Sequence, residues 1–141
     1  MKNLKVKIKL FDGGKLPEYK REGDVCLDCY ARESVDISKG KRKLVPLGFA
    51  LELPIGWEAV IRPRSGNTKG GVDIGIGTID TNYRGEVMAC IINNSDMDLL
   101  ATRGERICQL AIRESPKIEW EVVDELSETE RGANGFGSSG I

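Results

Sequence analysis

The sequence contains no histidine and only four cysteines, Cys26, Cys29, Cys90 and Cys108. A protein without histidine lacks the commonest general base and a frequent metal ligand, so catalysis here must rely on carboxylates, arginines, hydroxyls and backbone groups. The cysteines are too few for a disulfide framework, and we expect them to be reduced. Cys26 and Cys29 have the CxxC spacing of zinc and redox sites. No second pair and no histidine completes four ligands, which favours small buried strand residues.

Long apolar runs and an excess of one charge are also missing. No run approaches the ~18 apolar residues of a membrane span, and residues 1–10 alternate lysine with apolar residues instead of forming the apolar block of a signal peptide. The 21 basic and 22 acidic residues give a net charge of −1, which argues against a basic nucleic-acid surface. We therefore expect these 141 residues to form one soluble, cytoplasmic domain with no membrane or nucleic-acid partner.

Short apolar stretches, several of them alternating with polar residues, fill most of the chain. Alternation is the period of a half-buried strand. We expect strands at residues 4–10, 25–31, 47–53, 57–61, 99–102, 107–112 and 118–122. No window sustains a helical period, so helix should be limited to a turn or two around residues 67–69, and the basic run at 39–43 should be a solvated turn. The pattern predicts an all-β sandwich, jelly roll or barrel.

The composition changes near residue 128, which divides the chain into a β core at residues 1–127 and a C-terminal arm at residues 128–141. Residues 131–140 contain four glycines and one aromatic, so they offer little apolar surface for packing. We expect the arm to be flexible when free in solution.

Residues 77–87 place an acid and an aromatic on a turn between two predicted strands. Residues 78–79 and 87–93 would be the arms of a hairpin, with Asp80 and Tyr83 at its tip. A carboxylate and a phenol ring on a rigid turn suit the base and the floor of a small-ligand site. A solvated acidic turn with a half-buried tyrosine is the alternative interpretation of the same spacing.

Several polar segments have the chemistry of a phosphate site. Residues 75–80 lack the third glycine of a dinucleotide fingerprint, and residues 66–69 lack P-loop spacing. Residues 64–66 combine a guanidinium, a hydroxyl and a glycine that lets backbone N–H groups approach a ligand. Similar donors recur at Arg106, Gln109, Arg131, Ser138 and Ser139. Taken singly, each of these residues also fits an ordinary surface contact.

Five segments in order resemble the five motifs of the trimeric dUTP diphosphatase (dUTPase) family. They are residues 23–31, which are similar to AGxDLxA, residues 63–71 with Pro-Arg-Ser-Gly, residues 77–86, residues 104–110 and residues 131–140. The first four lie in the core and the fifth lies in the arm. The third and fifth are the most specific, and the first departs most from its pattern.

The resemblance implies a jelly-roll-like distorted β-barrel that assembles as a homotrimer, with active sites at the subunit interfaces. It also implies hydrolysis of dUTP to dUMP and diphosphate, which keeps uracil out of DNA and supplies dUMP for dTMP synthesis. Asp80 would activate the water that attacks the α-phosphorus. Mg²⁺ is the expected cofactor, held mainly by substrate phosphates and water and not directly by the protein.

By the same resemblance, the remaining site residues bind the nucleotide. Tyr83 would pack on the deoxyribose where a ribose 2′-OH would clash, the backbone around Gly77 and Ile79 would read the uracil edge, and Phe136 of the arm would cover the uracil. Phosphate binding falls to Arg64, Ser65, Gly66, Gln109, Arg131, Ser138 and Ser139, with Gly137 in the same lid segment and Asp28 and Arg106 in support.

Four positions depart from the family pattern. Cys26 replaces a glycine or another small residue, Glu105 replaces a frequent aspartate, Asn134 replaces a glycine and Ser139 replaces a threonine. Each keeps the polar function or a turn-compatible residue, and asparagine tolerates left-handed backbone better than other non-glycine residues. We expect these changes to affect lid geometry more than activity.

Two alternative functions remain open. A dCTP deaminase or a bifunctional deaminase-diphosphatase has the same architecture, and a non-catalytic, nucleotide-dependent regulatory protein would keep the fold without turnover. The Asp80 and Tyr83 pair and the glycine-rich tail favour dUTP hydrolysis over deamination. The polar residues retained in all five segments favour an active enzyme.

Overall fold

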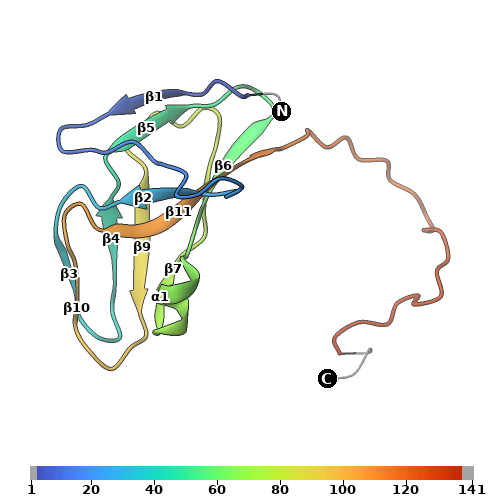
Figure 1. Ribbon diagram of the computed structural model, residues 1–141. Helices are drawn as coiled ribbons and strands as arrows, with labels where there is room; N and C mark the ends of the chain where they lie inside the picture. Colours follow the sequence, from blue (N-terminus) through green and yellow to red (C-terminus); the bar gives the residue numbers. More distant parts are fainter. Residues whose placement is uncertain (1–2, 138–141) are drawn as a thin grey trace.

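The computed structural model describes residues 3–137, whose strands form four antiparallel sheets (Figure 1). The strands are β1 (Lys7–Leu10), β2 (Leu27–Tyr30), β3 (Val35–Ile37), β4 (Arg42–Pro46), β5 (Phe49–Glu52), β6 (Trp57–Arg62), β7 (Val72–Ile74), β8 (Gly77–Ile79), β9 (Met88–Asn93), β10 (Leu99–Ala101) and β11 (Arg106–Glu114). A short helix, α1 (Ser65–Lys69), follows β6. The many short antiparallel strands confirm the predicted all-β, jelly-roll-like fold.

Two of the sheets carry most of the core. The strand order is β2-β11-β6-β8 in the larger sheet and β4-β9-β7 in the smaller one. Ile61 of β6, Leu110 of β11 and Ile91 of β9 are buried in one cluster with Phe49 of β5. Each such side chain contributes about 1.5–3 kcal/mol when fully buried. This packing fixes β11 inside the larger sheet and β8 at its edge.

Cys29 of β2 and Cys108 of β11 lie opposite each other in the core. Both are fully buried free thiols. The neighbouring Cys108 thiol, through a hydrogen bond, and then burial raise the pKa of Cys29, so it stays neutral. The prediction of a small buried strand residue is confirmed for Cys29. It is wrong for Cys26, which precedes β2 and is partly exposed.

The predicted hairpin between residues 78–79 and 87–93 does not form. β8 pairs with β6, whereas β9 pairs with β4 and β7, so the connection between them crosses from one sheet to the other. The turn itself is present, because the Tyr83 N–H donates to the Asp80 carbonyl at 3.1 Å. Val87 leaves the turn paired with a different part of the chain: its N–H donates to Phe49 O at 2.8 Å.

Two predicted strands lie outside the core. Residues 118–122 are extended but unpaired within the described chain, and Ile118, Trp120 and Val122 are 71%, 83% and 94% exposed. The strand prediction was wrong there because an alternating apolar pattern does not by itself provide a neighbouring strand to pair with. After β11 the chain runs away from the sheets, as Figure 1 shows. β1 does pair with β5, but its four residues are exposed and not half-buried as predicted.

Two loop predictions have different outcomes. α1 covers residues 65–69 and confirms the helical turn expected near residue 67. The basic turn predicted at residues 39–43 ends at Lys41, because Arg42 already pairs with Ile92 of β9. Gly40 makes the turn with a φ of 73°, a left-handed conformation that favours glycine. Among residues 3–137 no helix has the length and apolar character needed to cross a membrane.

Candidate functional site

A cavity of about 230 Å³ lies where β8 runs into the turn that carries Asp80 and Tyr83. Its lining comprises Ile61, Gly77, Thr78, Ile79, Asp80, Tyr83, Val87 and Met88. Ile61, Ile79 and Val87 are buried and give it an apolar floor, whereas the Asp80 side chain is exposed at its rim. The structure therefore brings together Gly77, Ile79, Asp80 and Tyr83, four of the five residues that the sequence assigned to the nucleoside and the base; the fifth, Phe136, does not line this cavity. We call this cavity the acidic pocket.

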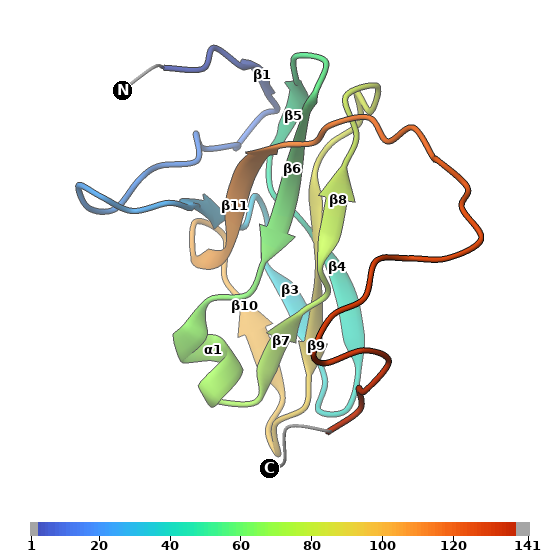
Figure 2. The ribbon, with the colours of Figure 1, turned by 90° about the vertical axis from the view of Figure 1, so that its right-hand side faces the viewer.

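The backbone of β8 contributes polar groups to the acidic pocket. β8 is the last strand of its sheet and, within the described residues, pairs only with β6. Its outer edge consequently presents N–H and C=O groups that a planar ligand can pair with, as an extended peptide does at a sheet edge. Figure 2 shows β8 at this edge of the sheet.

The Tyr83 ring is held in one orientation. Its hydroxyl donates a hydrogen bond to the Glu86 carbonyl at 2.9 Å. The ring also lies directly over Gly85, because a Cβ built there would come within 2.5 Å of the Tyr83 hydroxyl oxygen. A side chain at position 85 would displace the Tyr83 ring, so glycine leaves room for the phenol, which lines the acidic pocket.

Glu86 is anchored to a distant part of the chain. Its carboxylate accepts two hydrogen bonds from the Arg32 guanidinium, at 2.8 and 2.9 Å, and one from the Gly48 N–H at 2.9 Å. The Arg32 guanidinium, followed by the Gly48 N–H, holds the pKa of Glu86 below its usual value, even though partial burial acts the other way. The same contact raises the pKa of Arg32.

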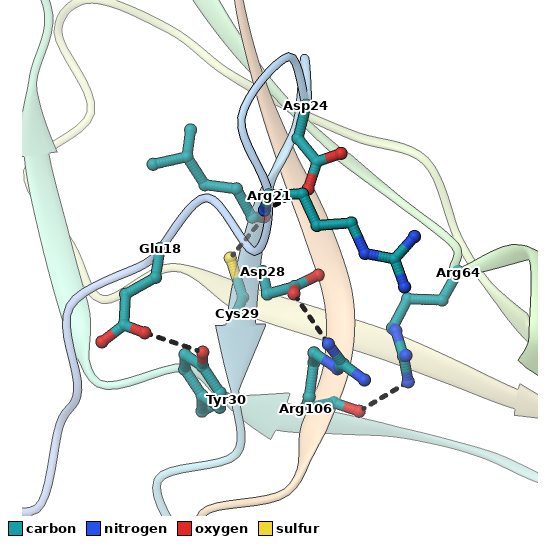
Figure 3. A network of polar contacts seen from close by, with 9 residues as sticks. Glu18, Arg21, Asp24, Asp28, Cys29, Tyr30, Arg64 and Arg106 are labelled. Carbon is teal, nitrogen blue, oxygen red and sulfur yellow. Dashed lines mark hydrogen bonds and ion pairs between the residues drawn. The ribbon is translucent and has the colours of Figure 1, made fainter.

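A second cavity, of about 380 Å³, is rich in cations. Its lining comprises Lys20, Arg21, Asp24, Val25, Cys26, Asp28, Arg64, Ser65, Gly66, Arg106 and Gln109. It unites six residues that the sequence assigned to phosphate binding or its support. Figure 3 shows the guanidinium groups of Arg21, Arg64 and Arg106 gathered near Asp28. We call this cavity the basic pocket.

One partly buried ion pair organises the basic pocket. Asp28 of β2 is 7% exposed and pairs with Arg106 of β11 at 3.1 Å. Arg64, which precedes α1, donates to the Arg106 carbonyl at 3.3 Å. Gln109 lies opposite Asp28 on one side and opposite Arg62 on the other. The central strand β11 therefore sets the spacing of donors that come from three segments far apart in sequence.

Lys20 and Arg21 line the basic pocket although the sequence analysis gave them no role. Their loop folds back over β2, because the Asp28 N–H donates to Glu18 O at 2.7 Å. The Arg21 N–H also donates to Asp24 Oδ2 at 2.8 Å and closes the loop. In the described residues neither cation has an ion-pair partner within 4.0 Å. In the sequence, the sign of such a role was two adjacent cations just before the first motif.

The acidic pocket and the basic pocket share no lining residue. Of the predicted arm residues, Arg131, Phe136 and Gly137 line neither of them. Arg131 donates to the Asn134 carbonyl at 2.7 Å in a local turn, and Phe136 is fully exposed with a left-handed φ of 50°. Gly137 follows it with a φ of 90°, whereas Ser138 and Ser139 lie outside the described residues. Over residues 3–137, no cluster of three or more acidic or thiol side chains is placed to hold a metal.

Comparison with known proteins agrees with these motifs. A model of the dUTPase family matches residues 12–140. The deoxyuridine 5′-triphosphate nucleotidohydrolase of Orientia tsutsugamushi (strain Boryong) is 45% identical over 147 residues and is matched over 98% of this chain and 99% of its own length. The Corynebacterium diphtheriae relative of the same name is 45% identical over 130 residues, covering 89% of this chain and 86% of its own length.

Solved structures share the fold. A mutant dUTPase of Staphylococcus bacteriophage 80alpha with dUpNHpp has a TM-score of 0.91 at 24% identity, covering 99% of this chain and all of that one. A mutant dUTPase of phage phi11 of S. aureus, solved with attention to a structural Mg(II) ion, has a TM-score of 0.80 at 20% identity and covers 86% of this chain and 98% of that one. Fold, motifs and near-complete family match agree, and the chain belongs to the dUTPase family.

Proposed function

We propose that this chain hydrolyses dUTP to dUMP and diphosphate, with Asp80 as the base that activates water. Family membership supports the reaction. The observation that carries the residue assignment is the convergence of Asp80, Tyr83 and the β8 backbone on one apolar-floored cavity. A pocket with an apolar floor and a few fixed polar groups suits a nucleoside.

The acidic pocket takes the deoxyuridine. The uracil lies on the floor made by Ile61, Ile79 and Val87, and its edge pairs with backbone groups of β8 between Gly77 and Ile79. The Tyr83 ring packs on the deoxyribose, and its fixed orientation leaves no room for a ribose 2′-OH. This assignment uses each wall of the cavity for one part of the nucleoside.

Asp80 acts at the rim of that pocket. Its exposed carboxylate orients a water molecule and accepts its proton while the water oxygen bonds to the α-phosphorus. The bond from the α-phosphorus to the bridging oxygen breaks, and diphosphate leaves. General-base help is worth about 10²–10⁴-fold, so charge stabilisation and positioning must supply the rest of the rate.

The basic pocket takes the triphosphate. Arg64, Ser65, Gly66 and Gln109 are the direct contacts in this proposal, and the Asp28–Arg106 pair supports them. Lys20 and Arg21 raise the positive charge of the pocket further. Four cationic side chains face only two carboxylates there, Asp24 and Asp28, which favours a polyanion.

A magnesium ion fits this pocket as part of the substrate. Asp28 is already paired with Arg106, and Asp24 accepts a bond from the Arg21 backbone, so the remaining polar side chains of the pocket are mainly donors. Mg²⁺ on the triphosphate would supply charge neutralisation, with phosphate oxygens and water as its ligands. Arg64 and Gln109 would orient the phosphate oxygens around it.

We propose a homotrimer in which different copies complete each site. The two pockets share no lining residue on one chain, which supports an arrangement in which Asp80 meets the basic pocket of a neighbour. The exposed apolar side chains of residues 118–122 support an arm that docks on another copy. In this arrangement residues 128–141 form the lid: Phe136 and Gly137 cover the uracil while Arg131, Ser138 and Ser139 reach the phosphates.

A nucleotide panel tests the proposal. The purified chain is incubated with dUTP, dCTP, UTP and dTTP, with and without Mg²⁺, while diphosphate and ammonia are measured. We expect Mg²⁺-dependent diphosphate release from dUTP far above the other nucleotides. Ammonia release from dCTP would support a deaminase, and binding of dUTP without turnover would support a regulatory protein. Either result would overturn the proposal.

A further inference from the structure

We propose that Arg32 and Glu86 are positioning residues that set the selectivity for dUTP over UTP by fixing Tyr83. Neither residue lines the acidic pocket. The inference rests on the proposed function, because it assumes that Tyr83 packs on the sugar. Nothing in the five motifs assigns a role to Arg32.

The link from Arg32 to the pocket is a continuous chain of contacts. The Glu86 carboxylate accepts two hydrogen bonds from the Arg32 guanidinium and one from the Gly48 N–H, so both of its oxygens are held. The carbonyl of the same residue accepts the Tyr83 hydroxyl at 2.9 Å. A shift of Glu86 therefore moves the acceptor that orients the phenol, which lies close over the intervening Gly85.

Arg32 is itself fixed at the other end of this chain. Its N–H donates to the Pro46 carbonyl at 2.9 Å. Its side-chain stem lies against Gly48, where an added Cβ would come within 3.3 Å of the Arg32 Cδ. The guanidinium is thus presented in a single direction, and the planar fork matches the Glu86 carboxylate with two parallel bonds.

Burial makes the pair more than a surface contact. The side chains of Arg32 and Glu86 are 28% and 17% exposed, so solvent screens them only in part. Removing one partner leaves a half-buried charge without compensation, which favours movement of the Glu86 backbone toward water. Misplacement of a positioning group by about 1 Å can cost about 10²-fold in catalysis.

The test measures kcat/KM for dUTP and for UTP in Arg32→Ala, Arg32→Lys and Glu86→Gln. We expect Arg32→Ala and Glu86→Gln to lower the dUTP/UTP ratio about 10-fold, with Arg32→Lys in between, because lysine keeps the charge but loses the fork. Arg113→Ala is the matched control: it breaks another Arg–Glu pair between strands, with Glu58 at 3.1 Å, and should leave the ratio unchanged.

Tyr83→Phe is the second arm of the test. It removes only the hydroxyl that bonds to the Glu86 carbonyl, so it should lower the ratio in the same direction. The double variant Arg32→Ala/Tyr83→Phe should then lose less than the product of the two single effects, because both act through one contact chain. If Arg32→Ala does not fold, Arg32→Lys and Tyr83→Phe decide the question.

A purely structural role gives a different result. Loss of folded protein lowers turnover of both nucleotides equally, so an unchanged dUTP/UTP ratio with a lower Tm would overturn the inference. Additive effects in the double variant would overturn it as well. Failure of the unmodified chain to hydrolyse dUTP would instead reject the proposed function, and the inference with it.

Discussion

The acidic pocket and the C-terminal arm differ in how far a single chain fixes them. In the acidic pocket, the Tyr83 hydroxyl donates a hydrogen bond to the Glu86 carbonyl at 2.9 Å. Glu86 is in turn anchored by its half-buried ion pair with Arg32. In the described part of the arm, residues 128–137, the side-chain hydrogen bonds are local, such as the one from Arg131 to the Asn134 carbonyl. The comparison indicates that the acidic pocket is preorganised on one chain, and in our proposal the C-terminal arm is ordered by substrate or by another copy.

Replacing Asp80 by asparagine should have the largest effect, because it removes the base from the preorganised pocket. We expect kcat for dUTP to fall by about 10²–10⁴-fold. The Kd of dUpNHpp should stay close to that of the unmodified chain, since asparagine keeps the shape and one acceptor. Steady-state kinetics and calorimetric titration measure the two quantities. Normal turnover in this variant would remove Asp80 from the base role.

Deleting residues 131–141 tests the other side of the comparison. We expect kcat/KM for dUTP to fall by about 10²-fold or more, because in our proposal the arm supplies phosphate contacts and excludes water. The trimer and its Tm should be retained, because residues 131–137 of the deleted segment are exposed apart from the partly buried Gly135. Kinetics with light scattering and thermal unfolding provide the readouts. Loss of the trimer would show that the segment is part of the assembly.

We expect a smaller effect, on thermal stability, when pH changes the charge of Glu86, which anchors the acidic pocket through Arg32. The Glu86 pKa is lowered in the folded state by Arg32, so its stabilisation is fully present above the ordinary value of 4.5 and is lost as pH falls through the lowered pKa. The Tm difference between the unmodified chain and Glu86→Gln should therefore be largest near neutral pH and shrink in acid. A difference that grows in acid would contradict this sign.

Part of this picture could be predicted from the sequence because the responsible signals are local. The turn at Asp80 follows from turn residues between apolar segments, and the helical turn at α1 follows from the lack of strand period there. Grouping of Arg64, Ser65, Gly66 and Gln109 followed from the motif resemblance. Each of these features depends on residues close together in the chain or on a recognised pattern.

The errors concern long-range partners. The hairpin prediction failed because β8 finds its partner in β6 and not in the next strand. The same limit hid the Arg32–Glu86 pair, whose members are 54 residues apart. Lys20 and Arg21 were missed because their loop reaches the basic pocket only through its pairing with β2. Residues 118–122 have the alternating pattern of a strand, but in the described chain no sheet edge pairs with them.

The most direct test of a site shared between copies is complementation. Asp80→Asn chains and Arg64→Ala chains are each expected to be nearly inactive as homotrimers. When the two are co-expressed and purified as mixed trimers, some sites combine an intact Asp80 from one copy with an intact basic pocket from another. We predict that the mixture recovers a measurable fraction of dUTP hydrolysis. Mixed trimers as inactive as either parent would contradict the account, because each site would then lie within one chain.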